Sequence, residues 1–186
     1  MFELVRAFCT EDFLHPLAFN ISKLPFEARK DTQVIFSNAL RWKPEVNKAS
    51  EPPVLQYVIT DKPDIIISLC RGYDKKESAA PCGGILREAL KYDVIAALIL
   101  YHEPNKTRAL EGIDPQEKAS GDGIFWNFFD WIDKSAFEIS ADAFNTFKVR
   151  LSTSPANHLI SVLTRTAGNS HTAQTIGSDL PPNQFR

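Results

Sequence analysis

Apolar residues recur along this chain with the spacing of amphipathic helices rather than with the alternation of strands. Val34, Ile35, Ala39 and Trp42 fall mostly on one side of a 3.6-residue helix. We expect this helix to open at Pro25, because the missing N–H of proline costs nothing in a first helical turn. The following residues, 43–53, are polar and contain prolines, which is typical of a loop.

The rest of the chain predicts further short helices. β-Branched residues leave helix and strand open over 54–59, and the helical neighbours favour a helix. Asp64 and the residues before it form a helix-start signature, and Gly72 is expected to end that helix in a left-handed C-cap. Ser135 is expected to cap the last helix, with Glu138 as its capping-box partner. The predicted helices cover 65–71, 77–91, 94–101, 124–132 and 135–151, and residues 103–123 are predicted to be a flexible insertion.

Three of the predicted helices superpose without gaps, at residues 26–40, 76–90 and 137–151. The matched positions are Glu27, Glu77 and Glu138 near the start, Phe36, Leu86 and Phe147 further on, and Leu40, Leu90 and Leu151 at the end. Solenoids tolerate unequal loops between such units, because each unit contacts only its neighbours. The alternative is three unrelated amphipathic helices with a few coincident apolar positions. We therefore predict an all-α, armadillo/HEAT-like partial solenoid over 1–151 and a disordered or divergent tail over 152–186.

Composition narrows the class of protein. The 186 residues suit one domain, and 44% hydrophobic with 24% charged residues is the balance of a globular protein. The net charge of −2 gives no strong attraction to nucleic acid. Three cysteines argue for a reducing compartment, and the apolar run 94–100 is too short to insert in a membrane. We expect a cytoplasmic protein.

Four segments, in order, carry a family resemblance. They are LPFEARKDTQVIF at 24–36, LCRGY at 69–73, LREA at 86–89 and SAFEISADAFNTFK at 135–148. On these segments the chain resembles the calcium-binding-protein-thirty-nine group, also called Mo-twenty-five-like scaffolds, and most of all its fungal HymA-like members. The likeness covers roughly residues 11–151.

The resemblance implies a non-catalytic armadillo-type scaffold without cofactors. Such a scaffold binds a germinal-centre-class Ser/Thr kinase or pseudokinase and stabilises its active conformation, in fungi within a morphogenesis network. Calcium binding is not expected, because the chain lacks the Asp-rich loop with a trailing Glu. Members of the family are longer, so the chain looks truncated. A fragment without function, with self-association through uncapped repeat ends, is the alternative.

A small enzyme with a dispersed site is the weaker alternative, because no catalytic constellation is visible. Cys82 precedes Gly83 and Gly84 inside a predicted helix. Small residues there are explained more simply by close helix packing than by a reactive Cys82 thiol. The four histidines show no metal-ligand spacing. We predict no catalytic, metal or cofactor site.

A partner-binding surface is the better candidate. The repeat alignment places Ser37, Arg87 and Lys148 at one position and Arg41, Lys91 and Ser152 one turn later, on the helices expected to line a concave wall. Arg41, Arg87, Lys91 and Lys148 would form a basic ridge for acidic or phosphorylated surfaces, unless they are ordinary solvated charges. Trp126, Phe129 and Trp131 are expected mostly in the core. Phe137 is expected to be an exposed aromatic anchor, with Tyr73 and Tyr101 as weaker ones.

Overall fold

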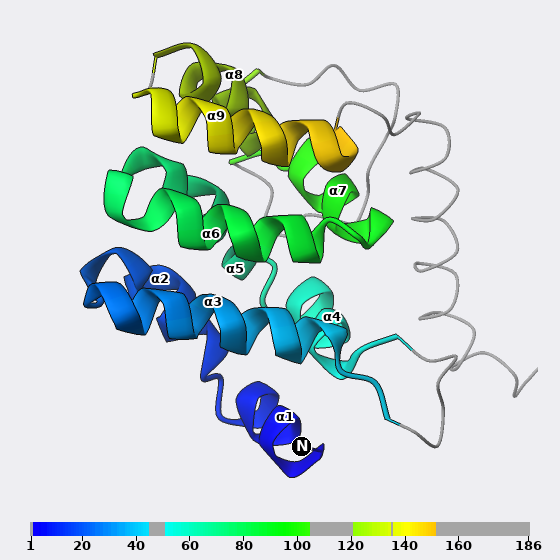
Figure 1. Cartoon of the computed structure of the whole chain (residues 1–186). Helices are drawn as coiled ribbons and strands as arrows, with labels where there is room; N and C mark the ends of the chain where they lie inside the picture. The colour runs from blue at the N-terminus through cyan, green and yellow to red at the C-terminus, as the bar shows by residue number, and fades with distance from the viewer. Residues whose placement is uncertain (1, 45–50, 105–120, 135, 152–186) are drawn as a thin grey trace, which may run out of the picture.

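The computed structural model describes residues 2–44, 51–104, 121–134 and 136–151, and these form three stacked units of three helices each (Figure 1). The first unit comprises α1 (Phe2–Thr10), α2 (Leu14–Asn20) and α3 (Phe26–Arg41). The second comprises α4 (Pro53–Thr60), α5 (Asp64–Arg71) and α6 (Lys76–Ala89). The third comprises α7 (Asp93–Leu100), α8 (Ile124–Lys134) and α9 (Phe137–Thr146). No strand occurs within these ranges.

Short turns link the helices inside the first and second units. The 3-10 turns η1 (Ile21–Lys23) and η3 (Gly72–Asp74) precede α3 and α6, and the π-helical turn η4 (Phe147–Leu151) continues α9. Corresponding helices of adjacent units contact one another: α1 with α4, α4 with α7, α2 with α5, α3 with α6, and α6 with α9. This nearest-neighbour stacking is the solenoid architecture that the repeat predicted.

One continuous core runs through the three units. Phe36 and Leu86 are 1% and 0% exposed and belong to the same buried cluster, and Phe147 packs against it. The superposition of the three helices is thereby confirmed at Phe36, Leu86 and Phe147, which share a single core. The short segment 54–59 is helical, as predicted.

Several local predictions were wrong. Gly72 has a right-handed φ of −56° and is not a left-handed cap. Its lack of a side chain instead serves packing, since a Cβ there would lie 2.4 Å from Cys82 Sγ.

Pro25 is the N-cap of α3 rather than part of its first turn. Ala136 is the N-cap of α9, where no side chain caps the helix, and Glu138 forms an ion pair with Lys76 at 2.8 Å. Ser135, the tail 152–186 and most of the predicted insertion lie outside the described residues.

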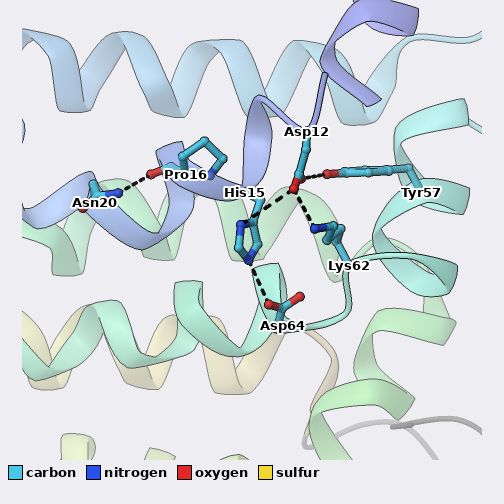
Figure 2. A network of polar contacts seen from close by, with 7 residues as sticks. All are labelled: Asp12, His15, Pro16, Asn20, Tyr57, Lys62 and Asp64. Carbon is cyan, nitrogen blue, oxygen red and sulfur yellow. Dashed lines mark hydrogen bonds and ion pairs between the residues drawn. The ribbon is translucent and has the colours of Figure 1, made fainter. Parts of the chain in front are cut away.

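A polar cluster fastens the first unit to the second at the turns between their helices (Figure 2). Asp12 has a left-handed backbone, φ 51°, which directs its carboxylate toward α4. That carboxylate accepts hydrogen bonds from the Tyr57 hydroxyl and from Lys62 Nζ, the latter at 2.6 Å. His15 Nε2 lies 2.9 Å from Asp64 Oδ2. The Lys62 and Tyr57 hydrogen bonds lower the pKa of Asp12, so the carboxylate is an ion at neutral pH.

The ends of the predicted insertion are joined by a direct contact. The Ile124 backbone N–H donates to His102 Nδ1 at 3.3 Å. A Cβ on Gly123 would lie 2.2 Å from the His102 carbonyl oxygen, so glycine is required for this close approach. The start of α8 is therefore fixed beside the end of α7.

Candidate partner-binding surface

Helices α3, α6 and α9 lie side by side and form one layer of the stack, which we call the ladder face (Figure 1). Two adjacent glycines in α6 make this close packing possible. A Cβ on Gly84 would lie 2.3 Å from Gln33 Nε2 on α3, and a Cβ on Gly83 would lie 1.9 Å from Asp142 Oδ2 on α9. The sequence interpretation of Cys82, Gly83 and Gly84 as packing residues is correct.

Glu88 joins two of the predicted ridge cations. Its Oε1 atom lies 2.8 Å from Arg41 Nε and 2.8 Å from Lys91 Nζ. The Glu88 side chain is 9% exposed, whereas those of Arg41 and Lys91 are 57% and 61% exposed. Burial alone would raise the pKa of Glu88, but the hydrogen bonds from Arg41 and Lys91 hold it below its ordinary value. Two exposed cations around one buried anion leave a net positive charge at the surface.

Arg87 is held more deeply, between α6 and α9. Its Nη1 donates to Asp142 Oδ2 and to Thr146 Oγ1, both at 2.9 Å. The Tyr73 hydroxyl donates to the same Asp142 oxygen at 2.8 Å and lies 2.7 Å from Thr146 Oγ1. Burial raises the pKa of Tyr73, so the phenol stays neutral. The Arg87 side chain is 32% exposed. Its contacts join α6 to α9, so only part of its surface is accessible to a partner.

The predicted site residues fall into two groups along the ladder face. Arg41 ends α3, Lys91 follows α6 by two residues, and Lys148 is exposed in η4, so these cations lie toward the C-terminal ends of the three helices. Phe137 begins α9 at the opposite edge, about 16 Å away along the helix from Lys148. The structure therefore separates the aromatic residue from the cations that the sequence analysis grouped with it.

The aromatic predictions had mixed outcomes. Phe137 is 86% exposed, as expected, and Trp131 is buried. Trp126 and Phe129 are 44% and 47% exposed and stack on each other, so their placement in the core was wrong. Helix α8 buries the face that carries Ile124, Phe128 and Trp131 instead. Tyr73 is 1% exposed and is not a surface anchor, because its ring packs on Phe128 and Trp131.

Sequence analysis missed the anions that hold the ridge cations. Glu88 stands three residues before Lys91, which is a spacing that pairs charges on one helix face. Nothing in the sequence indicated that Asp142 on α9 would meet Arg87 on α6, because that pairing depends on the packing of two repeats.

Thiol and metal chemistry find little support. Burial raises the pKa of Cys82 to about 12, and burial also raises the pKa of Cys70, so neither thiol is a ready nucleophile. Within the described ranges, no three His, Cys, Asp or Glu side chains are grouped as a metal site would require. None of the helices seen there has the length and apolar character to span a bilayer.

The architecture defines the chain as a helical-repeat protein of stacked three-helix units. Comparison with known proteins then gives the family. A family model described as Mo25-like matches residues 1–160, and the chain belongs to this family.

Three relatives show the range of similarity. The conidiophore development protein hymA of Emericella nidulans is 53% identical over 148 residues, which are 78% of this chain and 38% of the relative. The Mo25-like protein of Schizosaccharomyces pombe is 32% identical over 128 residues, 69% of this chain and 31% of the relative. The calcium-binding protein 39-like of Homo sapiens is 28% identical over 146 residues, which are 78% of this chain and 36% of the relative. The chain thus spans well under half the length of these relatives.

Proposed function

We propose that this chain is a non-catalytic cytoplasmic scaffold that binds a germinal-centre-class Ser/Thr kinase or pseudokinase and activates it allosterically. Membership of the Mo25-like family supports a role in kinase-associated signalling. A relative named for conidiophore development supports a place in fungal morphogenesis and cell polarity. The contacts of the ladder face suggest how such binding would work.

The observation that carries the proposal is the group of exposed cations at the C-terminal ends of the ladder helices. The side chains of Arg41 and Lys91 are exposed, and the buried Glu88 carboxylate holds Arg41 Nε and Lys91 Nζ in place. Exposed Lys148 lies on the neighbouring helix. Pre-positioned cations lose less conformational entropy on binding than free ones. Acidic or phosphorylated side chains of a kinase would complement them.

Activation would follow from selective binding. A rigid surface that fits the active kinase conformer better than the inactive one shifts the population toward the active state, without chemistry by the scaffold. The continuous core and the ties of Glu88 and Arg87 supply this rigidity. A differential affinity of tenfold would correspond to about 1.4 kcal/mol.

The proposal is tested by binding and activity measurements with the full chain and a purified germinal-centre-class kinase domain of a filamentous fungus. The double variant Lys91→Ala, Lys148→Ala should bind roughly tenfold more weakly. The control Arg6→Ala, Lys23→Ala removes two exposed cations from α1 and η1 and should bind like the wild type.

Two results would count against the proposal. Equal weakening by both double variants would indicate non-specific charge attraction. Failure of the folded wild-type chain to bind or stimulate any such kinase would favour the alternative of a fragment without function.

A further inference from the structure

A pocket of about 410 Å³ lies at the N-terminal edge of the ladder helices, away from the cations described above. It is bounded by η3, by α8 and by the start of α9, at the edge where α5 passes into α6 and α8 into α9 (Figure 1). Its lining residues are Tyr73, Asp74, Asn127, Asp130, Trp131, Ala136 and Ile139. No part of the proposed kinase contact uses these side chains.

The floor of the pocket is rigid and aromatic. Trp131 and Tyr73 are 5% and 1% exposed, and their rings pack 5.5 Å apart. Trp131 Nε1 donates to Asp74 Oδ1 at 2.7 Å. That bond fixes the direction of the Asp74 carboxylate at the rim.

The walls carry hydrogen-bond acceptors and negative charge. Asp74 and Asp130 are both exposed carboxylates that line the pocket, and the half-buried Asn127 lines it as well. Of the described cations near this edge, Lys76 is paired with Glu138 at 2.8 Å, and Lys75 Nζ donates to Ser22 at 3.4 Å. The two carboxylates at the rim make a positively charged group the complementary ligand.

Phe137 stands next to this opening. It follows Ala136, a lining residue, and its side chain is 86% exposed. Exposure of a whole phenyl ring is unfavourable in water, and aromatic rings beside polar pockets are common anchors in protein interfaces. The pocket and the ring together offer one charged and one apolar contact.

We propose that this edge of the molecule binds a short segment of a partner protein in which an arginine neighbours an apolar residue. The guanidinium enters the pocket over the aromatic floor, donates to Asp74 and Asp130, and leaves the apolar neighbour to pack on Phe137. Arginine fits better than lysine, because its flat fork can serve two carboxylates at once and is weakly hydrated. This site would let the scaffold hold a second protein while the ladder cations are occupied.

The test is an NMR titration of the ¹⁵N-labelled full chain with acetyl-Leu-Arg-Phe-amide. The indole N–H signal of Trp131 is monitored as the peptide is added. The Trp42→Phe and Trp126→Phe variants assign that signal. The peptide should shift it saturably, and the same peptide with citrulline, which lacks the charge, should bind roughly tenfold more weakly. Asp130→Asn and Asp74→Asn should each weaken the arginine peptide, and Asp74→Asn keeps an acceptor for Trp131.

Matched controls make the outcome decisive. Asp133→Asn changes an exposed carboxylate on the same helix that does not line the pocket, and it should leave the affinity unchanged. Phe137→Ala should weaken binding while the Trp131 signal still shifts. Equal affinity for the citrulline peptide, equal effects of Asp130→Asn and Asp133→Asn, or no saturable shift with the arginine peptide would each overturn the proposal.

Discussion

Gly83 lies directly beneath the Asp142 carboxylate, so close that a single added carbon on Gly83 would be 1.9 Å from Asp142 Oδ2. The same added carbon would lie 2.4 Å from the Tyr73 hydroxyl oxygen. Since Asp142 also accepts from Arg87, one missing side chain allows three polar groups to meet between α6 and α9. The separation of two ladder helices therefore depends on this glycine.

Gly83→Ala should lower the free energy of unfolding by about 1–3 kcal/mol, because overpacking forces α9 away from α6. Thermal and urea unfolding would measure it. Gly84→Ala is the matched control: its new carbon meets the end of the Gln33 side chain, which can rotate aside, so a smaller loss is expected. A larger loss for Gly84→Ala than for Gly83→Ala would contradict this account of the packing.

Phe36→Ala should be one of the most destabilising substitutions in the described core, at about 3–5 kcal/mol, because it removes a buried ring and leaves a cavity. Phe26→Ala on the same helix removes a ring that is 63% exposed and should cost under about 0.5 kcal/mol. Urea denaturation of the two variants compares them directly. Equal losses would show that Phe36 is not part of a continuous core.

The pairing of α3 with α6 should weaken in acid. The pKa of Glu88 is lowered in the folded chain from its ordinary value of 4.5, so its ionised form stabilises the fold at neutral pH. This contribution is fully present above 4.5 and is lost as the pH falls through the lower folded pKa. The Tm difference between wild type and Glu88→Gln should therefore be large at pH 7 and shrink below about pH 4.

Glu77→Gln serves as the control for this pH series, because Glu77 is an exposed carboxylate on the same helix. Its Tm should follow the wild-type curve. A wild-type minus Glu88→Gln difference that stays constant from pH 7 to pH 3 would contradict a role for the Glu88 charge.

The three thiols should react with a disulfide reagent in a fixed order. Cys9 is half-buried, whereas Cys70 and Cys82 are buried. Burial raises the pKa of all three thiols, so reaction at pH 7 should be slow throughout and should begin at Cys9. Mass spectrometry after brief labelling would identify the modified residue, and early labelling of Cys82 would contradict the packing of α6.

The sequence predicted the helical units after residue 25 because their apolar periodicity and the three superposed helices are local or repeated signals. It gave no bounds for α1 and α2. Helix α2 is short and contains Pro16, and α1 is amphipathic around the buried residue Val5, a signal that could have been used. Gly72 was misjudged because a glycine after a helix has two explanations, a left-handed cap or a close contact, and only the packing distinguishes them.

The candidate site was predicted in part. Repeat alignment brought Arg41, Lys91 and Lys148 to one end of the ladder face, but it could not show which cations are tied to acids. Burial of Glu88 and the contact between Arg87 and Asp142 arise from tertiary packing. The exposure of Trp126 depends in the same way on which face of α8 meets the core.

The hydrogen bond between Ile124 and His102 joins two residues that stand 22 positions apart in the sequence. Because Ile124 is the first residue of α8, this bond gives the first amide of the helix an acceptor and sets where the helix begins. The His102 ring is therefore a natural NMR reporter of whether α8 stays docked beside the end of α7.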